Sequence, residues 1–332
     1  MSFKRLPDTQ MDILILELQR QPLFKERLDQ DCKKGEVFPA IRKEGVVFYY
    51  RGGALFKFEK RREGCVFSTN LKYASVLRSK KDGSATKSDR KRGYSDYVTE
   101  EDIKDLEPIT NFYGKEEYKR IKENCGNYFS KKERAGVAKL CREFSCVRAT
   151  ARTDISVLDI EIAFEIDKDI DKEFKDIDKE SIAGETRRTK GGPRIDFVLM
   201  NKKGVLRFFE AKLYYNPELS YTSRLGYCPL LKQLDRYDEY IKKHKSIIIE
   251  AYKKDVKNIN KIFKTSLPEP KEIDPKVRAL VFGIGKEEPK IEEEKILNGQ
   301  HSERDRSFLR DRFCNIGSIN TKKGDVLEKL RF

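Results

Sequence analysis

The stretch GPRIDFVLMNKKGVLRFFEAKL, residues 192–213, decides how this chain is interpreted. Residues 194–200 and 205–213 are rich in β-branched, aromatic and other apolar side chains, and each run has the length of a strand. Asn201, two lysines and Gly204 lie between them, and a glycine that can adopt positive φ is typical of a tight turn. The stretch therefore predicts a β-hairpin whose strands are largely buried.

Three charged side chains interrupt these apolar strands: Asp196 in the first, and Glu210 and Lys212 in the second. Burying a charge is costly unless it is paired or bound to a metal. Glu210 and Lys212 share a face because they are two residues apart on a strand. The turn at 201–204 places Asp196 within about one residue of the position opposite Glu210, so that the two carboxylates can come to about 5 Å from each other.

Two carboxylates at this distance repel unless a cation lies between them, and hard oxygen ligands favour Mg²⁺ or Mn²⁺. A neighbouring lysine can orient a water molecule, help to deprotonate it, or stabilise a charged transition state. The alternative is a structural salt bridge of Asp196 and Glu210 with Lys212 at a sheet edge. Burial of two like charges favours the metal site over this alternative.

The tripeptide acid-x-Lys has little meaning by itself in a chain with 38% charged residues. It recurs, for example, from Asp255 to Lys257 and from Asp274 to Lys276. What distinguishes Glu210 and Lys212 is their place at the end of a strongly apolar strand, which a short turn connects to another strand with a lone Asp.

The 332-residue chain has a formal net charge of +15, with 71 Lys and Arg against 56 Asp and Glu. A globular protein this basic usually meets a polyanion, of which nucleic acid is the first candidate and an anionic membrane surface the second. A lysine-rich proteome would explain the charge without any partner. No apolar run approaches the roughly 18–20 residues of a membrane span, so we expect no membrane partner.

Histidine and cysteine narrow the chemistry further. The only two histidines, His244 and His301, lie in polar, lysine-rich or acidic surroundings, and we expect both on the solvated surface. This argues against zinc deaminase or Ser-His-Asp chemistry and favours catalysis by carboxylates, lysine and a metal. The seven cysteines are odd in number and scattered, which indicates reduced thiols and a cytoplasmic location.

In the first part of the chain, residues 9–33 are expected to be helical with a break at Pro22. Residues 46–50 and 54–60 predict a hairpin, and residues 65–68 a further strand. The aromatic residues of this hairpin lie among basic ones. Such a pattern is typical of a surface that stacks on nucleic-acid bases, but it fits a sheet with one buried aromatic face equally well. Residues 78–93 are polar and basic, as in a solvated loop or a phosphate-binding arm.

The remaining pattern is mixed α and β. We expect a helix over 130–144, a half-buried strand over about 158–165, a charged insertion over 167–192, and the hairpin. A long helix starts at Pro229 and runs, with a break, to residue 263, and Gln233 and Tyr237 lie one turn apart on it. Residues 277–285 predict a buried strand, and residues 290–298 and the region near 308 predict helix.

The hairpin, with Asp196 on one strand and Glu210, Ala211 and Lys212 on the other, resembles the core of the PD-(D/E)xK nuclease superfamily, which has the restriction-endonuclease-like fold. Gln233 and Tyr237 are similar to the Q-x-x-x-Y motif of its RecB-like branch. The resemblance covers about residues 130–285. It implies an α/β (α+β) fold class, with a mixed central sheet flanked by helices in 130–285. A smaller basic α+β domain with a β-hairpin, 1–129, precedes this core, and a C-terminal helical extension, 286–332, follows it.

By this resemblance, Asp196 and Glu210 with the Ala211 carbonyl would bind Mg²⁺, or Mn²⁺, and Lys212 would be the catalytic lysine. Gln233, Tyr237 and Arg194 would contact nucleic acid. An upstream acid often completes such sites, and Glu133 matches its position best, with Glu143, Asp159 and Glu161 as alternatives. The family usually has a proline just before the Asp, whereas two residues separate Pro193 from Asp196 here.

These observations predict a cytoplasmic Mg²⁺-dependent endonuclease that cleaves DNA, with a restriction or phage-defence role by analogy of fold. Residues 1–129 would supply a basic surface for recognition, and the arrangement is compatible with a homodimer. The alternatives are an RNA-cleaving effector with the same core and a non-catalytic nucleic-acid-binding protein with a degenerate core. The intact set of Asp, Glu and Lys argues against the last.

Overall fold

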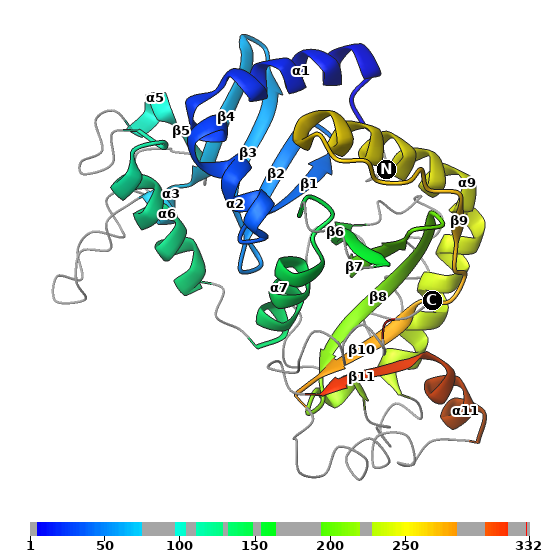
Figure 1. Ribbon diagram of the computed structural model, residues 1–332. Coiled ribbons are helices and arrows are strands. Elements are labelled where there is room, and N and C mark those ends of the chain that lie inside the picture. Colours follow the sequence, from blue (N-terminus) through cyan, green and yellow to red (C-terminus); the bar gives the residue numbers. More distant parts are fainter. Residues whose placement is uncertain are drawn as a thin grey trace, which may run out of the picture. The chain divides into compact units, whose positions relative to one another are not determined.

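The computed structural model describes residues 5–74, 97–103, 111–128, 132–148, 154–163, 194–219, 228–283, 303–317 and 330. The chain divides into two compact units (Figure 1). The N-terminal unit comprises Leu6–Ser156 together with Asp255–Leu267. The C-terminal unit comprises Val157–Lys254 and Pro268–Phe332, with Met1–Arg5. The protein is thus of the mixed α and β class, as predicted, with one β-sheet in each unit.

The N-terminal unit contains a five-stranded antiparallel sheet in the order β1-β2-β3-β4-β5. The predicted hairpin is present as β2 and β3, and its turn uses positive φ at Arg51 and Gly52. Phe48, Phe56 and Phe58 have no solvent exposure, so their side chains form the core of this unit. The bounds of the strands are Phe38–Arg42, Gly45–Tyr50, Gly53–Arg61, Gly64–Asn70 and Tyr97–Thr99.

Helices pack against this sheet. The predicted break at Pro22 separates α1, which ends at Arg20, from a π-helical turn and α2. A Cβ atom at Gly35, just after α2, would collide with the Arg142 carbonyl oxygen of α7. The helix predicted over 130–144 therefore packs within the N-terminal unit. The helical bounds are α1 Asp8–Arg20, η1 Phe24–Leu28, α2 Asp29–Lys34, α3 Leu71–Ala74, α5 Glu100–Ile103, α6 Lys115–Tyr128 and α7 Lys132–Phe144.

The C-terminal unit contains a six-stranded mixed sheet in the order β11-β10-β8-β7-β6, with the short β9 paired to β8. The predicted hairpin forms its centre: β7 and β8 are antiparallel, and β10 and then β11 continue the sheet in parallel to β8 (Figure 1). The strand bounds are β6 Ile155–Ala163, β7 Arg194–Asn201, β8 Val205–Leu213, β9 Glu272–Ile273, β10 Arg278–Phe282 and β11 Phe313–Gly317.

The helix α9, Pro229–Phe263, kinks at His244, whose backbone leaves the helical region. His244 is half-buried with its ring 4.4 Å from that of Tyr240, so the expectation of a solvated surface histidine is wrong. The ring of Tyr252 lies 6.1 Å from that of Phe208, so α9 covers the face of β8 on which Phe208 lies. Among the described segments, no helix has both the length and the apolar character that crossing a membrane requires.

The structure differs from the sequence patterns at two further places. The predicted strand over 158–165 is not half-buried, because Asp159 on its expected polar face is only 3% exposed and accepts a hydrogen bond from Tyr252. The C-terminal region forms not only α11, Glu303–Arg312, but also the strand β11. His301, the basic segment 78–93, the insertion 167–192 and the predicted helix 290–298 lie outside the described residues.

Candidate active site

Asp196 and Glu210 face each other across the central hairpin. The paired residues of the two strands end at Phe197 and Phe209, and Asp196 and Glu210 are the next residues along each strand. Cross-strand partners point to the same face of a sheet, and Lys212 shares this face because it lies two residues beyond Glu210. The register agrees with the one predicted from the turn, and the three charged groups come together.

Lys212 is buried between two carboxylates. Its Nζ lies 2.8 Å from Glu210 Oε1 and 2.7 Å from Glu218 Oε2, and 8% of the residue is exposed. Glu218 lies in η3, Pro217–Leu219, a 3-10 turn that follows β8. The charges and hydrogen bonds of Glu210 and Glu218 outweigh burial and raise the pKa of Lys212 well above that of a free lysine, so its ammonium is charged at neutral pH.

Asp196 is held by the backbone of the opposite strand. Its Oδ2 accepts a hydrogen bond of 2.6 Å from the Ala211 amide. Burial raises the pKa of the Asp196 carboxyl well above its ordinary value, and the negative charge of Glu210 raises it further. Lys212 and the Ala211 amide act in the opposite direction but do not compensate. The protein thus holds Asp196 in a position where its charged form is disfavoured.

Glu210 is almost fully buried, with 4% of the residue exposed. Its Oε1 accepts hydrogen bonds from Lys212 Nζ and from Gln233 Nε2, at 2.8 and 3.0 Å. Its Oε2 is also buried and has no hydrogen-bond partner among the described residues. Burial raises the pKa of the Glu210 carboxyl, against the lowering effect of Lys212. A buried carboxylate oxygen without a partner is costly and is a position where a cation would be stabilised.

Gln233 and Tyr237, the two residues of the predicted Q-x-x-x-Y motif, connect α9 to the candidate site. Gln233 Nε2 donates to Glu210 Oε1 and also lies 2.9 Å from the Tyr237 hydroxyl. The Tyr237 hydroxyl in turn donates to the carbonyl of Arg194 on β7, at 2.7 Å, and Tyr237 is 2% exposed. Tyr237 is therefore buried and ties α9 to the hairpin, while the side chain of Arg194 is 56% exposed.

The four candidates for an upstream acid have different surroundings. Glu161 on β6 has a φ of 51°, which is rare for a residue with a side chain, and it lies 3.8 Å from Arg194 Nη1. Its charge contributes to the raised pKa of Asp196. Asp159 accepts from Tyr252, and Glu143 pairs with Arg148 in the N-terminal unit. Glu133 lies in α7, and its side chain is outside the described part.

The donor set fits a hard divalent cation. Asp196 and Glu210 supply two carboxylates on one face, and Glu210 Oε2 is free to coordinate. Within the described residues, no three side chains of His, Cys, Asp or Glu form a group that could hold a metal by themselves. Mg²⁺ commonly binds through one or two carboxylates and keeps several water molecules, so the two carboxylates with the Ala211 carbonyl suffice in principle.

Glu218 was missed by the sequence analysis. It follows β8 in a turn of polar residues, and nothing in the local pattern distinguishes it from other surface glutamates. Its role becomes visible only through its contact with Lys212.

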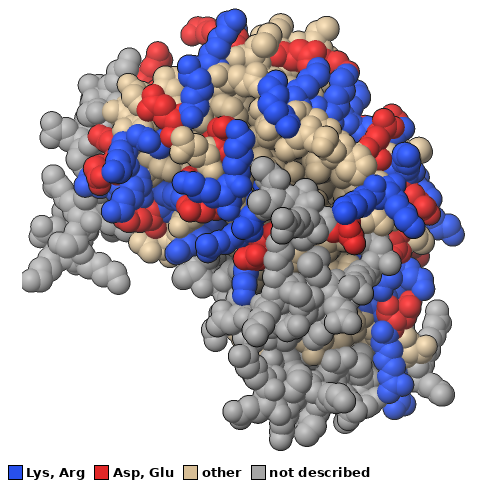
Figure 2. Space-filling model, viewed as in Figure 1, with Lys and Arg blue, Asp and Glu red and all other residues tan. Residues whose placement is uncertain are grey.

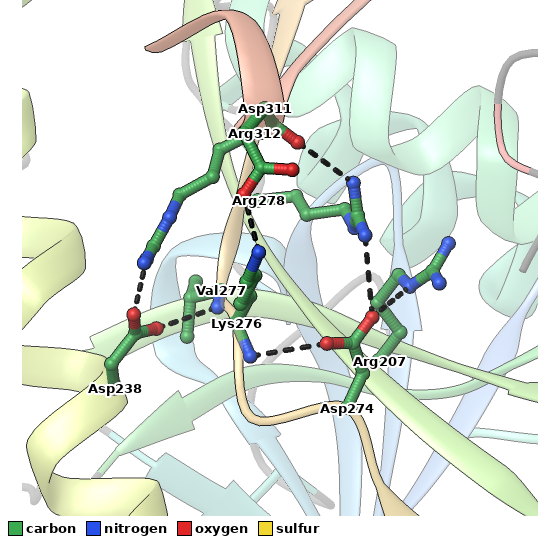
Figure 3. Close-up of polar contacts among 8 residues, drawn as sticks. All are labelled: Arg207, Asp238, Asp274, Lys276, Val277, Arg278, Asp311 and Arg312. Carbon is green, nitrogen blue, oxygen red and sulfur yellow. Dashed lines mark hydrogen bonds and ion pairs between the residues drawn. The ribbon is translucent and has the colours of Figure 1, made fainter. Parts of the chain in front are cut away.

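A second charged cluster lies at the start of β10 and is called here the arginine cluster: Arg207, Asp238, Asp274, Lys276, Arg278, Asp311 and Arg312 (Figure 3). Asp274 binds Arg207 at 2.7 Å and Arg278 at 3.4 Å. Asp238 on α9 binds Arg312 and also accepts from the Val277 amide. Asp311 binds Lys276. Arg207 points to the opposite face of β8 from Glu210, since the two are three positions apart on the strand.

Comparisons of the chain with protein-family models, with curated proteins and with solved structures give no match.

Proposed function

We propose that this chain is a Mg²⁺-dependent nuclease that hydrolyses phosphodiester bonds in nucleic acid, with DNA favoured over RNA. The observation that carries the proposal is the pair of half-buried Asp196 and buried Glu210 on the two strands of the hairpin, close enough for their charges to interact, with Lys212 bound to Glu210. An unpartnered Glu210 Oε2 and a raised Asp196 pKa are properties of a carboxylate pair that a bound cation would stabilise.

Each residue has a role in this proposal. Asp196, Glu210 and the Ala211 carbonyl would hold Mg²⁺, which when bound supplies Lewis-acid activation of a phosphoryl oxygen or of water. Lys212 stays protonated, so it would stabilise negative charge that develops on the scissile phosphate rather than accept a proton. Gln233 and Tyr237 keep Glu210 and the hairpin in register with α9. Arg194 is 56% exposed and pairs with Glu161 at 3.8 Å, and its guanidinium would also contact a phosphate of the substrate.

The order of the elements supports the proposal. The strand β6, the hairpin β7–β8, the helix α9 and the strand β10 follow one another in the order of the PD-(D/E)xK core that the sequence resembles, whereas α7, which the resemblance includes in that core, belongs to the N-terminal unit. The central sheet is mixed, as in that core. The packing of α7 on α2 in the N-terminal unit is a difference from the predicted boundary at residue 129.

The charge of the chain supports a nucleic-acid substrate more weakly than the residues of the site do. The chain carries +15 overall, yet Lys and Arg are interspersed with Asp and Glu over the described part of the face in Figure 2. The proposal of a nucleic-acid substrate therefore rests on the carboxylates and lysine of the candidate site and not on a contiguous basic surface. A restriction or phage-defence role, with the N-terminal unit in recognition, follows by analogy with nucleases that join such a core to a separate recognition module.

The test is a cleavage assay with single- and double-stranded DNA and RNA, in Mg²⁺, Mn²⁺ or EDTA. We expect cleavage of DNA with Mg²⁺ or Mn²⁺ and none in EDTA. Glu210→Gln and Lys212→Ala should each reduce the rate by about a hundredfold or more, the size of effect of removing one transition-state charge interaction. Lys203→Ala is the matched control, because Lys203 is an exposed lysine in the turn of the same hairpin.

Cleavage in EDTA, or an unchanged rate in Glu210→Gln and Lys212→Ala, would contradict the mechanism. Cleavage of RNA alone would identify the RNA-cleaving alternative with the same core. If no substrate is cleaved but salt-sensitive binding to DNA or RNA remains, the chain is a binding protein with a degenerate core.

A further inference from the structure

Lys212 has a second carboxylate partner that comes from outside the hairpin. Glu210 lies two residues before it on β8, whereas Glu218 belongs to the turn η3. The Lys212 side chain is 10% exposed and that of Glu218 is 46% exposed. Glu218 therefore binds the ammonium from the solvent side, and Glu210 binds it from the interior.

The backbone of Glu218 is fixed on both sides. Its amide donates to Asn216 Oδ1 at 2.9 Å, and its carbonyl accepts from Cys228 Sγ at 3.2 Å. The Asn216 amide donates to the Leu213 carbonyl at 2.8 Å, so the turn is connected to the end of β8. The next residue, Leu219, is 1% exposed and anchors the turn in the core. The carboxylate of Glu218 is thus carried by an ordered turn rather than by a free loop.

We propose that Glu218 is a positioning residue that fixes the direction of the Lys212 ammonium. An ammonium group has three N–H donors, and a single acceptor lets the long side chain pivot about one hydrogen bond. Two acceptors in different directions fix the position of Nζ and the directions of all three N–H bonds. Glu210 and Glu218 take two of them, which leaves the third in a defined direction for an oxygen of the substrate phosphate.

The catalytic consequence of this arrangement rests on the proposed nuclease function. A lysine side chain has four rotatable bonds, and the entropy of ordering them opposes catalysis if they are ordered only when substrate binds. Glu218 orders the end of the side chain in advance, so that the charge is already in place when the phosphate arrives. A carboxylate that instead bound the metal would act on metal affinity, and this difference makes the role of Glu218 testable.

The kinetic test compares Glu218→Ala, Glu218→Gln and the control Glu269→Ala, whose side chain is 63% exposed and binds Lys253 at 3.4 Å. Glu218→Ala should lower kcat about tenfold or more, the effect of one hydrogen bond to a charged group. KM and the Mg²⁺ concentration for half-maximal rate should stay unchanged. Glu218→Gln should recover most of the rate, because its amide oxygen can accept the same hydrogen bond. Wild-type kcat in Glu218→Ala, or a raised Mg²⁺ requirement, would overturn the proposal.

A second measurement does not depend on cleavage. Brief acetylation of the folded protein by an amine-reactive reagent, read by mass spectrometry, should modify Lys212 slowly in the wild type and several-fold faster in Glu218→Ala, with Lys203 as internal reference. Equal labelling of Lys212 in the two proteins would overturn the inference, provided that circular dichroism shows both folded. If labelling increases although the wild type cleaves nothing, the proposed function fails and the positioning by Glu218 stands.

Discussion

The candidate site and the arginine cluster are two groups of charged residues in the C-terminal unit, each with a residue on β8, and they have opposite balances of charge. In the site, Glu210 and Glu218 bind Lys212, and Asp196 is near enough for the charge of Lys212 to act on it, so three carboxylates lie around one buried ammonium. In the arginine cluster, Asp238, Asp274 and Asp311 meet three arginines and Lys276. Each of those carboxylates has a cationic partner.

The difference shows which buried charges are structural. The arginine cluster is closed: its ion pairs connect β8, α9, β10 and α11, and nothing further is required to neutralise its carboxylates (Figure 3). The site is open, since its carboxylates outnumber its one ammonium and Glu210 Oε2 has no partner among the described residues. Burial raises the pKa of Asp238 in the arginine cluster as well as those of Asp196 and Glu210, so the balance of charges is what distinguishes the two clusters. An excess of buried carboxylates on a sheet is typical of a functional site. Such an excess lowers the stability of the fold, and a bound cation would neutralise it.

The largest expected effect on stability lies in the closed cluster. Asp274→Ala removes the carboxylate that Arg207 Nε binds at 2.7 Å, and Arg207 is only 8% exposed. A buried guanidinium left without its partner should lower the free energy of unfolding by about 3 kcal/mol. Chemical denaturation measures this change.

The control for that prediction is Asp311→Ala in the same cluster. Its ion pair with Lys276 is about half-exposed at both ends, so the change in unfolding free energy should stay within about 1 kcal/mol. A similar loss of unfolding free energy in Asp274→Ala and Asp311→Ala would mean that burial does not determine the strength of these ion pairs. It would contradict the distinction between the closed and the open cluster.

A smaller effect is expected from metal binding at the open cluster. A ligand that binds only the folded state at a hundred times its Kd stabilises it by about 2.7 kcal/mol. Mg²⁺ should therefore raise the Tm of the wild type and of Asp274→Ala, and leave the Tm of Asp196→Asn unchanged. Thermal unfolding with and without Mg²⁺ measures this, and an equal shift in Asp196→Asn would place the metal elsewhere.

The smallest effect is a pH dependence of the metal-free protein. The folded-state pKa of Asp196 is raised above its unfolded value, so between the two values the folded state binds more protons than the unfolded state. Stability should therefore fall as pH rises through this window. In EDTA, Asp196→Asn should equal the wild type in acid and exceed its unfolding free energy at neutral pH. A variant that is less stable than the wild type at neutral pH would contradict a disfavoured Asp196 charge.

The sequence predicts the open cluster better than the closed one, for a physical reason. Asp196, Glu210 and Lys212 lie within one hairpin, where strand alternation and turn length determine which side chains meet. The bond from Gln233 to Glu210 joins a helix to a strand. The resemblance to known nucleases singled out Gln233 as a nucleic-acid contact and did not predict this bond. The local sequence pattern is enough to predict a contact between two side chains when both belong to one short motif.

Contacts between distant segments could not be predicted in this way. Arg312 and Asp238 are 74 residues apart, and Tyr252 and Asp159 are 93 apart. Asp159 therefore looked like a solvated residue of an alternating strand, although Tyr252 from α9 covers it. Glu218 gave no signal either, because a glutamate in a polar turn acquires meaning only from the lysine that it meets.

The most direct test of the central claim is the position of a bound metal. Crystals soaked in Mn²⁺, which replaces Mg²⁺ and scatters anomalously, should show an anomalous peak within coordination distance of Asp196 and Glu210 Oε2. We expect no peak at the arginine cluster. A peak only at other sites, or an Asp196 and Glu210 pair that stays without metal at millimolar Mn²⁺, would contradict the assignment of these carboxylates as a metal site.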